Sequence, residues 1–375
     1  MMKASAAGEA ASGLPALPPI LPRTPRRVAL ICDPRFRGGT SAAVAAELRA
    51  LAGTARLSVA AIETAMFRGR AVHPAIAAAL EETGTPLDWN PPVIRADAVL
   101  FHNPSCLRYD RVLRVRISCE TALVVTHENF LRPNGSEGFD VGACLDRIED
   151  ALICGRRFLA PVSAANRQGV AAWLGRGGRD WSLLPRDWTN VLDLPRAAPS
   201  PCPRDRRGRH SRPGLEKFPP LEVLRAHFPP HAERSVILGG DMLLRDPEAL
   251  PPHWDVRRFG TAADVARCLA EIDFFVYFTP PAWSESFGRA IAEAIAAGKL
   301  VITDPGTAQG FGPGVIASDG RDVDAIVRRF IEAPEEYAKC VRAAQDGLEA
   351  FGPAAFAARA GRLLETDGAP CHALV

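Results

Sequence analysis

Hydrophobic positions gather in short runs along the first half of the chain, and each run ends in polar or turn-forming residues. Four such runs read VALIC at 28–32, ARLSVAAI at 55–62, ADAVLFHNPS at 96–105 and TALVVTHENF at 121–130. Runs of this length are typical of β-strands, and helical segments lie between several of them. Strands that alternate with helices predict a mostly parallel sheet with helices on both faces.

The same pattern begins again in the second half. The run DFFVYF at 273–278 is apolar at nearly every position, which is typical of a strand buried on both faces of a sheet. The last predicted elements are two helical stretches, 334–351 and 353–365. Further strands are predicted at 233–241, 253–260 and 299–305, and further helices at 261–272, 288–298 and 321–333.

A break in composition separates the two halves. The segment LPRAAPSPCPRDRRGRHSRPG, residues 194–214, is too rich in proline and charge for a regular element, so we place a domain boundary there. The predicted fold class is α/β, with two doubly wound, Rossmann-like domains that face each other across a cleft. A ligand is expected at the carboxyl ends of the parallel strands. The assignment is a disordered tail at 1–26, an N-terminal domain at 27–195, a C-terminal domain at 196–340 and C-terminal helices at 341–375.

Composition narrows the class of protein. A chain of 375 residues suits two domains, and a formal net charge of +2 gives no overall field that would favour nucleic acid or an anionic membrane. The 9 cysteines are scattered without a C-x-x-C pair, so neither a disulfide framework nor a zinc site is indicated. The N-terminal residues contain no long apolar run, and we expect neither a signal peptide nor a membrane span. A cytoplasmic protein fits these observations.

Two carboxylates mark the segment after the DFFVYF run. Glu285 lies in the turn that follows the predicted strand, and Glu293 lies within the predicted helix. The backbone N–H groups at the start of this helix form an anion site, and Gly288 lets a ligand approach the backbone closely. A carboxylate at Glu293 can accept hydrogen bonds from two neighbouring hydroxyls, as a ribose presents them. The alternative is a solvated acid at 285 and a surface acid at 293 that pairs with Arg289.

The stretch ESFGRAIAEAIAAGKLVITD, which begins at Glu285, resembles the E-x7-E signature of retaining glycosyltransferases of the GT-B fold, family 4. It departs from the usual frame at Lys299–Leu300 and at Ser286, and both carboxylates are retained. The resemblance implies that Glu293 binds the nucleotide ribose. It also implies that Glu285 holds the donor sugar together with the amides of three residues, Ser286, Phe287 and Gly288.

A second segment, RRGRHSRPGLEKFP, resembles the G-R-x…K element of the same family. The resemblance assigns Arg209 and Lys217, with Arg212 as a further candidate, to neutralising the donor diphosphate. This chemistry is apt, because without a metal a departing nucleoside diphosphate needs fixed cations. The alternative is that these arginines belong to a solvated linker.

The N-terminal half offers weaker signals. Gly38 and Gly39 in RFRGGTSAAVAAEL match the glycine loop that in this family lies against the diphosphate and the acceptor, although a plain strand-to-helix turn is the alternative. His127 follows an apolar strand, where the family often has a histidine near the donor sugar. His102 is placed similarly, so the sequence leaves open which histidine faces the cleft, and a lone histidine at a strand end is often structural.

Some motifs are missing from the sequence. No G-x-G-x-x-G follows a strand, and no G-x-x-x-x-G-K-[ST] occurs, so a dehydrogenase or a P-loop enzyme lacks its central motif. Asp322 and Asp324 match D-x-D by letters, but they open a predicted helix and are interpreted as capping acids. We predict no metal site and no cofactor.

Together these features predict a metal-independent, retaining glycosyltransferase that moves a sugar from a nucleotide-diphosphate sugar to an unknown acceptor: a glycan, a lipid or a small molecule. By resemblance, the N-terminal domain is the acceptor side, the C-terminal domain is the donor side, and the helices at 341–375 cross back onto the N-terminal domain. The resemblance also implies that the leaving phosphate assists deprotonation of the acceptor. Nucleic acid is not expected as a partner, and peripheral contact with a membrane stays open. The alternatives are a GT-B-fold sugar-nucleotide epimerase and a degenerate, non-catalytic sugar-nucleotide-binding protein.

Overall fold

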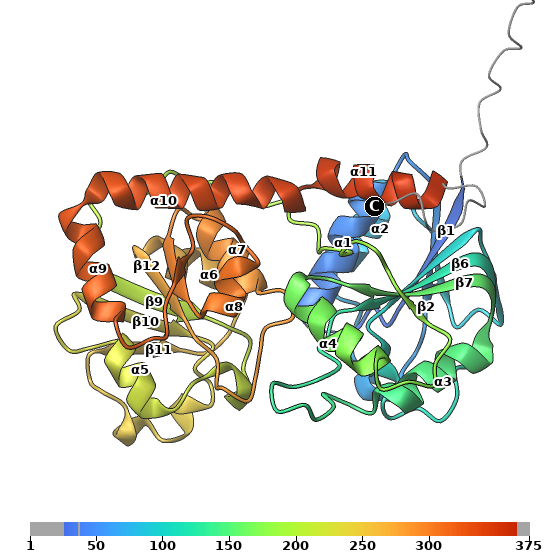
Figure 1. Cartoon of the computed structure of the whole chain (residues 1–375), viewed down its shortest axis with the longest axis horizontal. Coiled ribbons are helices and arrows are strands. Elements are labelled where there is room, and N and C mark those ends of the chain that lie inside the picture. The colour runs from blue at the N-terminus through green and yellow to red at the C-terminus, as the bar shows by residue number, and fades with distance from the viewer. Residues whose placement is uncertain (1–25, 37, 366–375) are drawn as a thin grey trace, which may run out of the picture.

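The computed structural model describes residues 26–36 and 38–365, and Figure 1 shows them as two α/β domains side by side. The tail predicted at 1–26 therefore lies outside the described residues except for Arg26. Within the described residues, each domain contains one sheet in which all strand pairs are parallel, with helices packed on it. The predicted fold class, two doubly wound α/β domains, is confirmed.

The first domain contains an eight-stranded sheet in the order β3-β2-β1-β5-β6-β7-β8, with β4 paired to β6. Its strands are β1 (Arg27–Cys32), β2 (Arg56–Ala61), β3 (Leu87–Trp89), β4 (Val93–Arg95), β5 (Ala98–His102), β6 (Arg116–Thr126), β7 (Leu152–Pro161) and β8 (Ser182–Leu183). Its helices are α1 (Gly39–Leu51), α2 (Pro74–Thr83), α3 (Val141–Ala151) and α4 (Ala164–Leu174), with short 3₁₀ turns η1 (Ala65–Phe67) and η2 (Pro104–Leu107).

The second domain contains a six-stranded sheet in the order β11-β10-β9-β12-β13-β14. Its strands are β9 (Arg206–His210), β10 (Arg234–Leu238), β11 (Trp254–Arg257), β12 (Phe274–Tyr277), β13 (Leu300–Thr303) and β14 (Ile316–Ala317). Its helical elements are η3 (Leu215–Lys217), α5 (Leu221–His227), η4 (Leu243–Arg245), η5 (Pro247–Ala249), α6 (Ala262–Ala270), α7 (Arg289–Ala296), α8 (Pro305–Gln309), α9 (Val323–Glu332), α10 (Pro334–Gly347), η6 (Leu348–Phe351) and α11 (Pro353–Glu365).

In each sheet, successive strands are added first toward one edge and then toward the other. The point where this order reverses determines where a ligand can bind. In the first domain the order reverses between β1 and β5, and in the second it reverses between β9 and β12. Loops leave the carboxyl ends of the two strands in opposite directions at such a point, which opens a crevice. The crevices lie at the carboxyl ends of β1 and β5 and of β9 and β12, and His102, His210 and Tyr277 end three of these strands.

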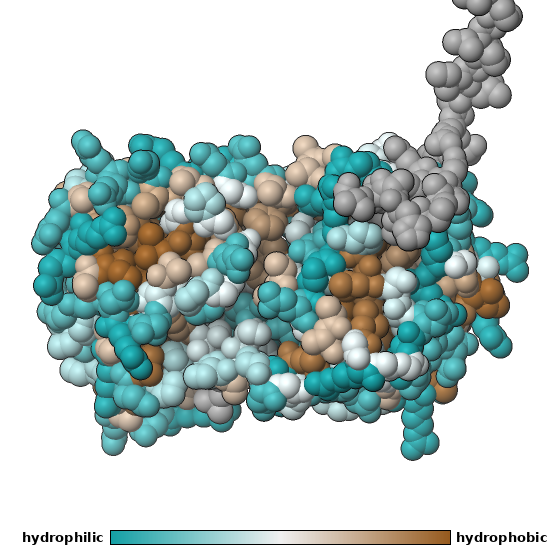
Figure 2. Space-filling view, viewed as in Figure 1, coloured by the Kyte–Doolittle hydropathy of each residue, from teal (hydrophilic) through white to brown (hydrophobic). Residues whose placement is uncertain are grey.

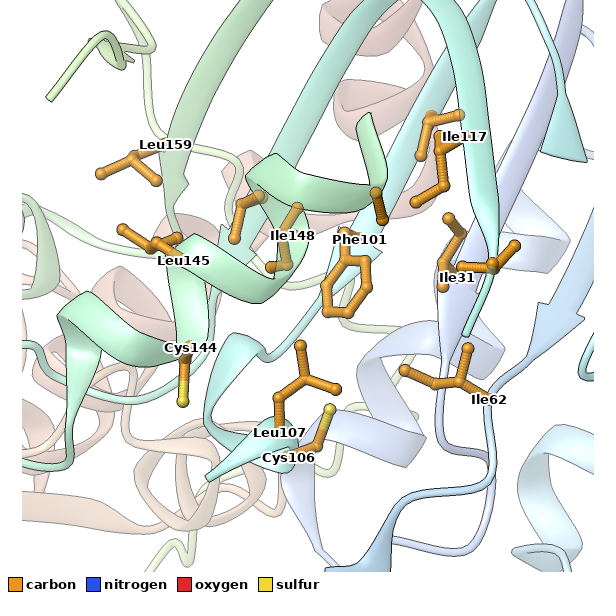
Figure 3. Close-up of a cluster of buried hydrophobic side chains, with 14 of the residues drawn as sticks. Ile31, Ile62, Phe101, Cys106, Leu107, Ile117, Cys144, Leu145, Ile148 and Leu159 are labelled. Atoms are coloured by element: carbon orange, nitrogen blue, oxygen red, sulfur yellow. The ribbon is translucent and has the colours of Figure 1, made fainter. Parts of the chain in front are cut away.

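Alternating side chains of the central strands build two cores in the first domain. Ile31 of β1 and Phe101 of β5 point to one face of the sheet, and Leu30 and Leu100 point to the other. Figure 3 shows part of the first of these cores, in which α3 supplies side chains above the strands. The period of two that the sequence shows in these runs therefore buries both faces of the sheet. Hydrophilic residues cover most of the molecular face seen in Figure 2, with separate hydrophobic patches on each domain.

The structure corrects the interpretation of 194–214 as irregular throughout. Residues Arg206–His210 form β9, which pairs with β10 on one side and β12 on the other at the centre of the second sheet. The sequence hides this strand because buried parallel strands are ordinarily apolar. Here the charge is compensated instead: Arg207 is fully buried, and its Nη2 donates to Asp324 Oδ1 at 2.7 Å and to Asp205 Oδ2 at 2.9 Å.

The last helices connect the two domains. Helix α10 packs against α7 and β13 of the second domain, and α11 packs against α1 of the first (Figure 1). Phe356 of α11 meets the ring of Trp188 edge-on, with ring centroids 5.0 Å apart. In the described residues, no helix is both long enough and apolar enough to cross a membrane.

Candidate active site

Polar contacts join the two domains beside the E-x7-E segment. Asn129, which follows β6, donates from Nδ2 to the backbone oxygen and to Oγ of Ser284, both at 3.0 Å. Ser163 Oγ donates to the backbone oxygen of Ser286. The loop before α7 thus lies at the seam between the domains, where a small cavity opens. Its lining consists of Glu128, Asn129, Leu131, Arg132, Pro133, Gly138, Trp283, Ser284 and Ser286.

The structure brings Glu285 and Lys217 together, although they are 68 residues apart in the chain. Lys217 Nζ donates to Glu285 Oε1 at 2.6 Å, and Tyr277 Oη donates to the same oxygen at 2.7 Å. Burial alone would raise the pKa of Glu285, but Lys217, Tyr277 and the more distant Arg212 outweigh it and hold this pKa below its usual value. The carboxylate is therefore ionised and already partnered before any ligand binds.

Arg209 lies beneath this pair and does not reach the surface. Its exposed fraction is 0%, and its Nη1 donates to the backbone oxygen of Phe278 at 3.1 Å while Nη2 donates to that of Lys217. The guanidinium also stacks on the rings of Phe218 and Tyr277, with Cζ 4.4 and 4.8 Å from the ring centroids. Burial lowers the pKa of Arg209 to about 10. Direct contact between Arg209 and a diphosphate stays a prediction, and it would require these neighbours to move.

Glu293 lies in α7 and is only partly satisfied. Its Oε1 accepts from Arg289 Nε at 2.8 Å, which is the pairing that the sequence raised as an alternative. Its Oε2 lies 3.7 Å from Nε2 of the buried His210 and makes no hydrogen bond within the described part of the chain. Burial raises the pKa of Glu293 despite the opposing effect of Arg289, and burial lowers the pKa of His210 to about 4. One oxygen of this carboxylate is thus free to accept a ligand hydroxyl.

The turn before α7 requires glycine at position 288 for its own backbone conformation and packing. Gly288 has φ +86°, and a Cβ there would lie 3.2 Å from the Phe311 ring and 3.3 Å from Ile291. Phe287 packs edge-on against Phe311 and Phe351, with ring centroids 5.9 and 5.4 Å apart, and so anchors the turn. Its side chain is therefore structural, and only its amide is available to a ligand.

The structure settles the relative placement of the two histidines. His102 ends β5 and is 1% exposed, whereas His127 follows β6 and is half-buried. Their ring nitrogens, His102 Nδ1 and His127 Nε2, are 3.0 Å apart. His127 is thus the outer histidine, two residues before the domain contact of Asn129. Burial lowers the pKa of His127 well below its usual value, and the neighbouring His102 lowers it further.

The remaining predicted residues make no hydrogen bond to Glu285 or Glu293 within the described part of the chain. Gly38 caps α1 and is partly buried, and a Cβ there would lie 3.0 Å from the Phe36 ring, whereas Gly39, the first residue of α1, is exposed. Arg212 is half-exposed and pairs with Glu216 at 2.9 Å. Arg212 nevertheless acts on Glu285 through its charge, because it is one of the groups that lower the pKa of that carboxyl.

Asp324, the second aspartate of the D-x-D match, belongs to a separate cluster of polar side chains. Asp324 lies with Asp205 and His231 in a group whose ligand atoms are within 4.8 Å of one another. Arg207 donates to both carboxylates, so the positive charge in this group is already supplied. Asp205 precedes β9, which places the cluster at the amino edge of the sheet, away from the crevices. Asp322 caps α9 by position, but its carboxylate accepts from Ser318 Oγ instead of a helix amide.

Several residues of this site were not found from the sequence. Tyr277 was interpreted only as part of a buried strand, although a tyrosine at the last position of a strand is a recognisable signal, because its hydroxyl can reach polar groups beyond the strand, here Glu285. Trp283, whose ring lies 5.6 Å from Lys217 Nζ, and Ser284 carry no such signal. Asn129 stands in the HEN triplet that follows a strand, where polar residues point to a site.

The class of fold follows from this geometry and from solved structures: the chain has the GT-B fold of glycosyltransferases. Anabaena HepE, solved in complex with UDP and glucose, is 15% identical with a TM-score of 0.63, over 90% of this chain and 99% of HepE. The sucrose-phosphate synthase of Thermosynechococcus elongatus is 15% identical with a TM-score of 0.59, over 90% of this chain and 98% of that chain. An α-glucosyltransferase in complex with UDP and DNA is 8% identical with a TM-score of 0.58, over 91% and 99%. No family model and no curated protein matches the sequence.

Proposed function

We propose that this protein is a glycosyltransferase that transfers a sugar from a nucleotide-diphosphate sugar. The observation that carries the proposal is the arrangement at the carboxyl end of β12. There a buried Lys217–Glu285 pair and the carboxylate of Glu293, which has one oxygen without a hydrogen bond in the described part of the chain, flank the start of α7. The GT-B fold supports it, and the solved neighbours that hold UDP or UDP-glucose favour a uridine nucleotide as the first to test.

Each residue has a distinct role in the proposed reaction. Glu293 accepts hydrogen bonds from the ribose through Oε2, and Glu285 with the amides of Ser286, Phe287 and Gly288 holds the sugar. Lys217 stabilises the diphosphate as negative charge develops on the leaving group. For this, Lys217 must share its ammonium between Glu285 and a phosphate oxygen, which its three donor hydrogens permit.

The finer mechanism follows from the same resemblance and is part of the proposal. Arg209 and Lys217 supply fixed positive charge, so the reaction does not depend on a metal ion. We assign no side chain as a nucleophile; in the proposed mechanism the leaving phosphate accepts the acceptor proton on the same face of the sugar, which retains the anomeric configuration. Closure of the domains across the Asn129–Ser284 contact excludes water from the donor.

A thermal-shift screen followed by an assay tests the proposal. Nucleoside diphosphates and their sugars, beginning with UDP and UDP-glucose, should raise the melting temperature, because binding to the native state stabilises it. The nucleotide that binds is then supplied as its sugar with a panel of glycan, lipid and small-molecule acceptors, and release of the nucleoside diphosphate is measured. Formation of an epimer from the donor alone would instead establish an epimerase. Binding without turnover on any acceptor would leave the non-catalytic alternative.

A further inference from the structure

A buried polar chain runs from the core of the first domain to His127. It begins at Trp188, whose Nε1 donates to Glu47 Oε2 at 3.0 Å. Glu47 Oε1 lies 3.4 Å from His102 Nε2, and His102 Nδ1 lies 3.0 Å from His127 Nε2. Glu47 is 4% exposed, and it lies on the inner face of α1, the helix that the glycine loop opens.

The two facing atoms of Glu47 and His102 lack other hydrogen-bond partners in the part of the chain that the structure describes. Within the described residues, neither Glu47 Oε1 nor His102 Nε2 makes any hydrogen bond to another group. A buried polar atom without a partner is costly, so these two atoms are expected to satisfy each other. The indole of Trp188 can only donate, which requires an acceptor at Glu47 Oε2.

The protons of this chain can be arranged in only one way if Glu47 is a carboxylate and both imidazoles are neutral. Glu47 Oε1 accepts the proton of His102 Nε2, which leaves His102 Nδ1 bare. His102 Nδ1 then accepts from His127 Nε2–H, which leaves His127 Nδ1 as a bare acceptor. Within the described part of the chain His127 Nδ1 makes no hydrogen bond, and His127 is the outer, half-buried member of the pair.

We propose that Glu47 and His102 are positioning residues that fix the tautomer of His127, so that His127 presents an unprotonated Nδ1 to a ligand hydroxyl. This inference rests on the proposed function for the identity of the ligand, a hydroxyl of the transferred sugar. The tautomer itself is a property of the free protein. Trp188 contributes to this hydrogen-bonded chain because it donates to the other oxygen of Glu47, and its ring packs against Phe356 of α11.

Glu47→Gln is the decisive variant because Trp188 orients the new amide. The indole N–H needs the amide oxygen, so the amide NH₂ faces His102 Nε2 and donates to it. His102 must then carry its proton on Nδ1 and donate to His127 Nε2, and His127 in turn carries its proton on Nδ1. One atom changed in the core therefore converts the outer nitrogen of His127 from an acceptor into a donor.

Long-range ¹H–¹⁵N spectra of histidine-labelled full-length protein measure both tautomers directly. The expected result is Nε2–H for His102 and His127 in the wild type and Nδ1–H for both in Glu47→Gln. Trp188→Phe is the matched control: it removes a hydrogen bond from Glu47 but leaves the carboxylate facing His102, so both tautomers should stay Nε2–H. An Nδ1–H tautomer of His127 in the wild type, or unchanged tautomers in Glu47→Gln, would overturn the proposal. The wild-type spectrum decides this even where the variant does not fold.

Kinetics adds a readout that depends on the proposed function. Glu47→Gln should lower kcat/KM for the sugar nucleotide roughly tenfold, the factor expected for one lost hydrogen bond, with unchanged affinity for the free nucleoside diphosphate. A protein without transferase activity would refute the proposed function and leave the spectra to decide the tautomer. An equal loss of free diphosphate affinity in Glu47→Gln would show general damage and overturn the positioning role.

Discussion

Glu285 and Glu293 flank the same turn, but the protein treats the two carboxylates in opposite ways. Burial would raise the pKa of both groups. Around Glu285 the bonds from Lys217 and Tyr277 outweigh burial and lower the pKa, whereas around Glu293 the single bond from Arg289 does not, and the pKa is raised. The comparison teaches that spacing in a motif says nothing about charge state, which depends on partners supplied by other segments.

The difference also separates the proposed roles. Glu285 is bound to a lysine that a diphosphate would also attract, so ligand binding at Glu285 redistributes an existing ion pair. Glu293 offers an oxygen without a hydrogen bond in the described part of the chain, so a ligand can bind there without breaking anything. In the proposed function, Glu285 is thus coupled to catalysis, and Glu293 contributes to nucleotide binding alone.

Lys217→Ala should have the largest effect, because it removes the partner that distinguishes Glu285. A buried ion pair that loses one member typically costs about 3–5 kcal/mol, so the free energy of unfolding should fall by an amount near the lower end of that range. Affinity for the nucleoside diphosphate should weaken by roughly 2–4 kcal/mol if the pair is desolvated on closure. Chemical denaturation and isothermal titration measure the two effects.

Two further variants control this experiment. Lys339→Ala removes an exposed lysine of α10 and should leave both quantities unchanged. Lys217→Ala/Glu285→Ala should recover part of the lost stability, because no unpaired buried charge is left. Unchanged diphosphate affinity in Lys217→Ala would return residues 205–217 to a structural role.

The opposite pKa shifts predict opposite pH dependences of stability. The lowered pKa of Glu285 contributes stability above its usual value of 4.5 that is lost as pH falls through the folded pKa. The raised pKa of Glu293 acts in reverse: ionisation costs stability as pH rises from 4.5 through the folded pKa. At neutral pH, Glu285→Gln should therefore be less stable than the wild type and Glu293→Gln more stable.

Denaturant titrations of these two variants from acid to neutral pH measure the comparison, with the wild type as reference. The difference between Glu285→Gln and the wild type should shrink below pH 4.5, and that between Glu293→Gln and the wild type should grow above it. Parallel curves for the two variants would show that their carboxylates have equivalent environments and would remove the basis of the comparison.

Chelation should have the smallest effect. If Lys217 and Arg209 supply the positive charge, transferase activity should be the same with and without EDTA. The assay is initial rate with the full donor in chelator-treated buffer, with Mg²⁺ and Mn²⁺ added back. Loss of activity that either ion restores would show that a metal supplies the charge assigned to these residues.

Much of the fold follows from the sequence, because apolar runs such as DFFVYF need only a local pattern to be recognised. Strand β9 could not be recognised from a local pattern, because the burial of Arg207 depends on Asp324, which lies 117 residues away. The carboxylates at 285 and 293 were found by spacing. The Lys217–Glu285 pair and the Glu47–His102 contact were not, because they arise only when separate strands and helices meet.

The most direct test of the account is isothermal titration of the nucleoside diphosphate that the thermal-shift screen selects, with Glu293→Ala and Glu285→Ala. Hydrogen bonds to a charged acceptor are worth about 1.5–3 kcal/mol each, so Glu293→Ala should raise Kd roughly 10-fold to 100-fold. Repeating the titration with the 2′-deoxy and 3′-deoxy nucleotides should show that the wild type loses affinity and Glu293→Ala loses none. Glu285→Ala should bind the free diphosphate at least as well as the wild type, because Lys217 is released from its partner. Equal losses in both variants would contradict the division of roles, and wild-type affinity in both would contradict the site itself.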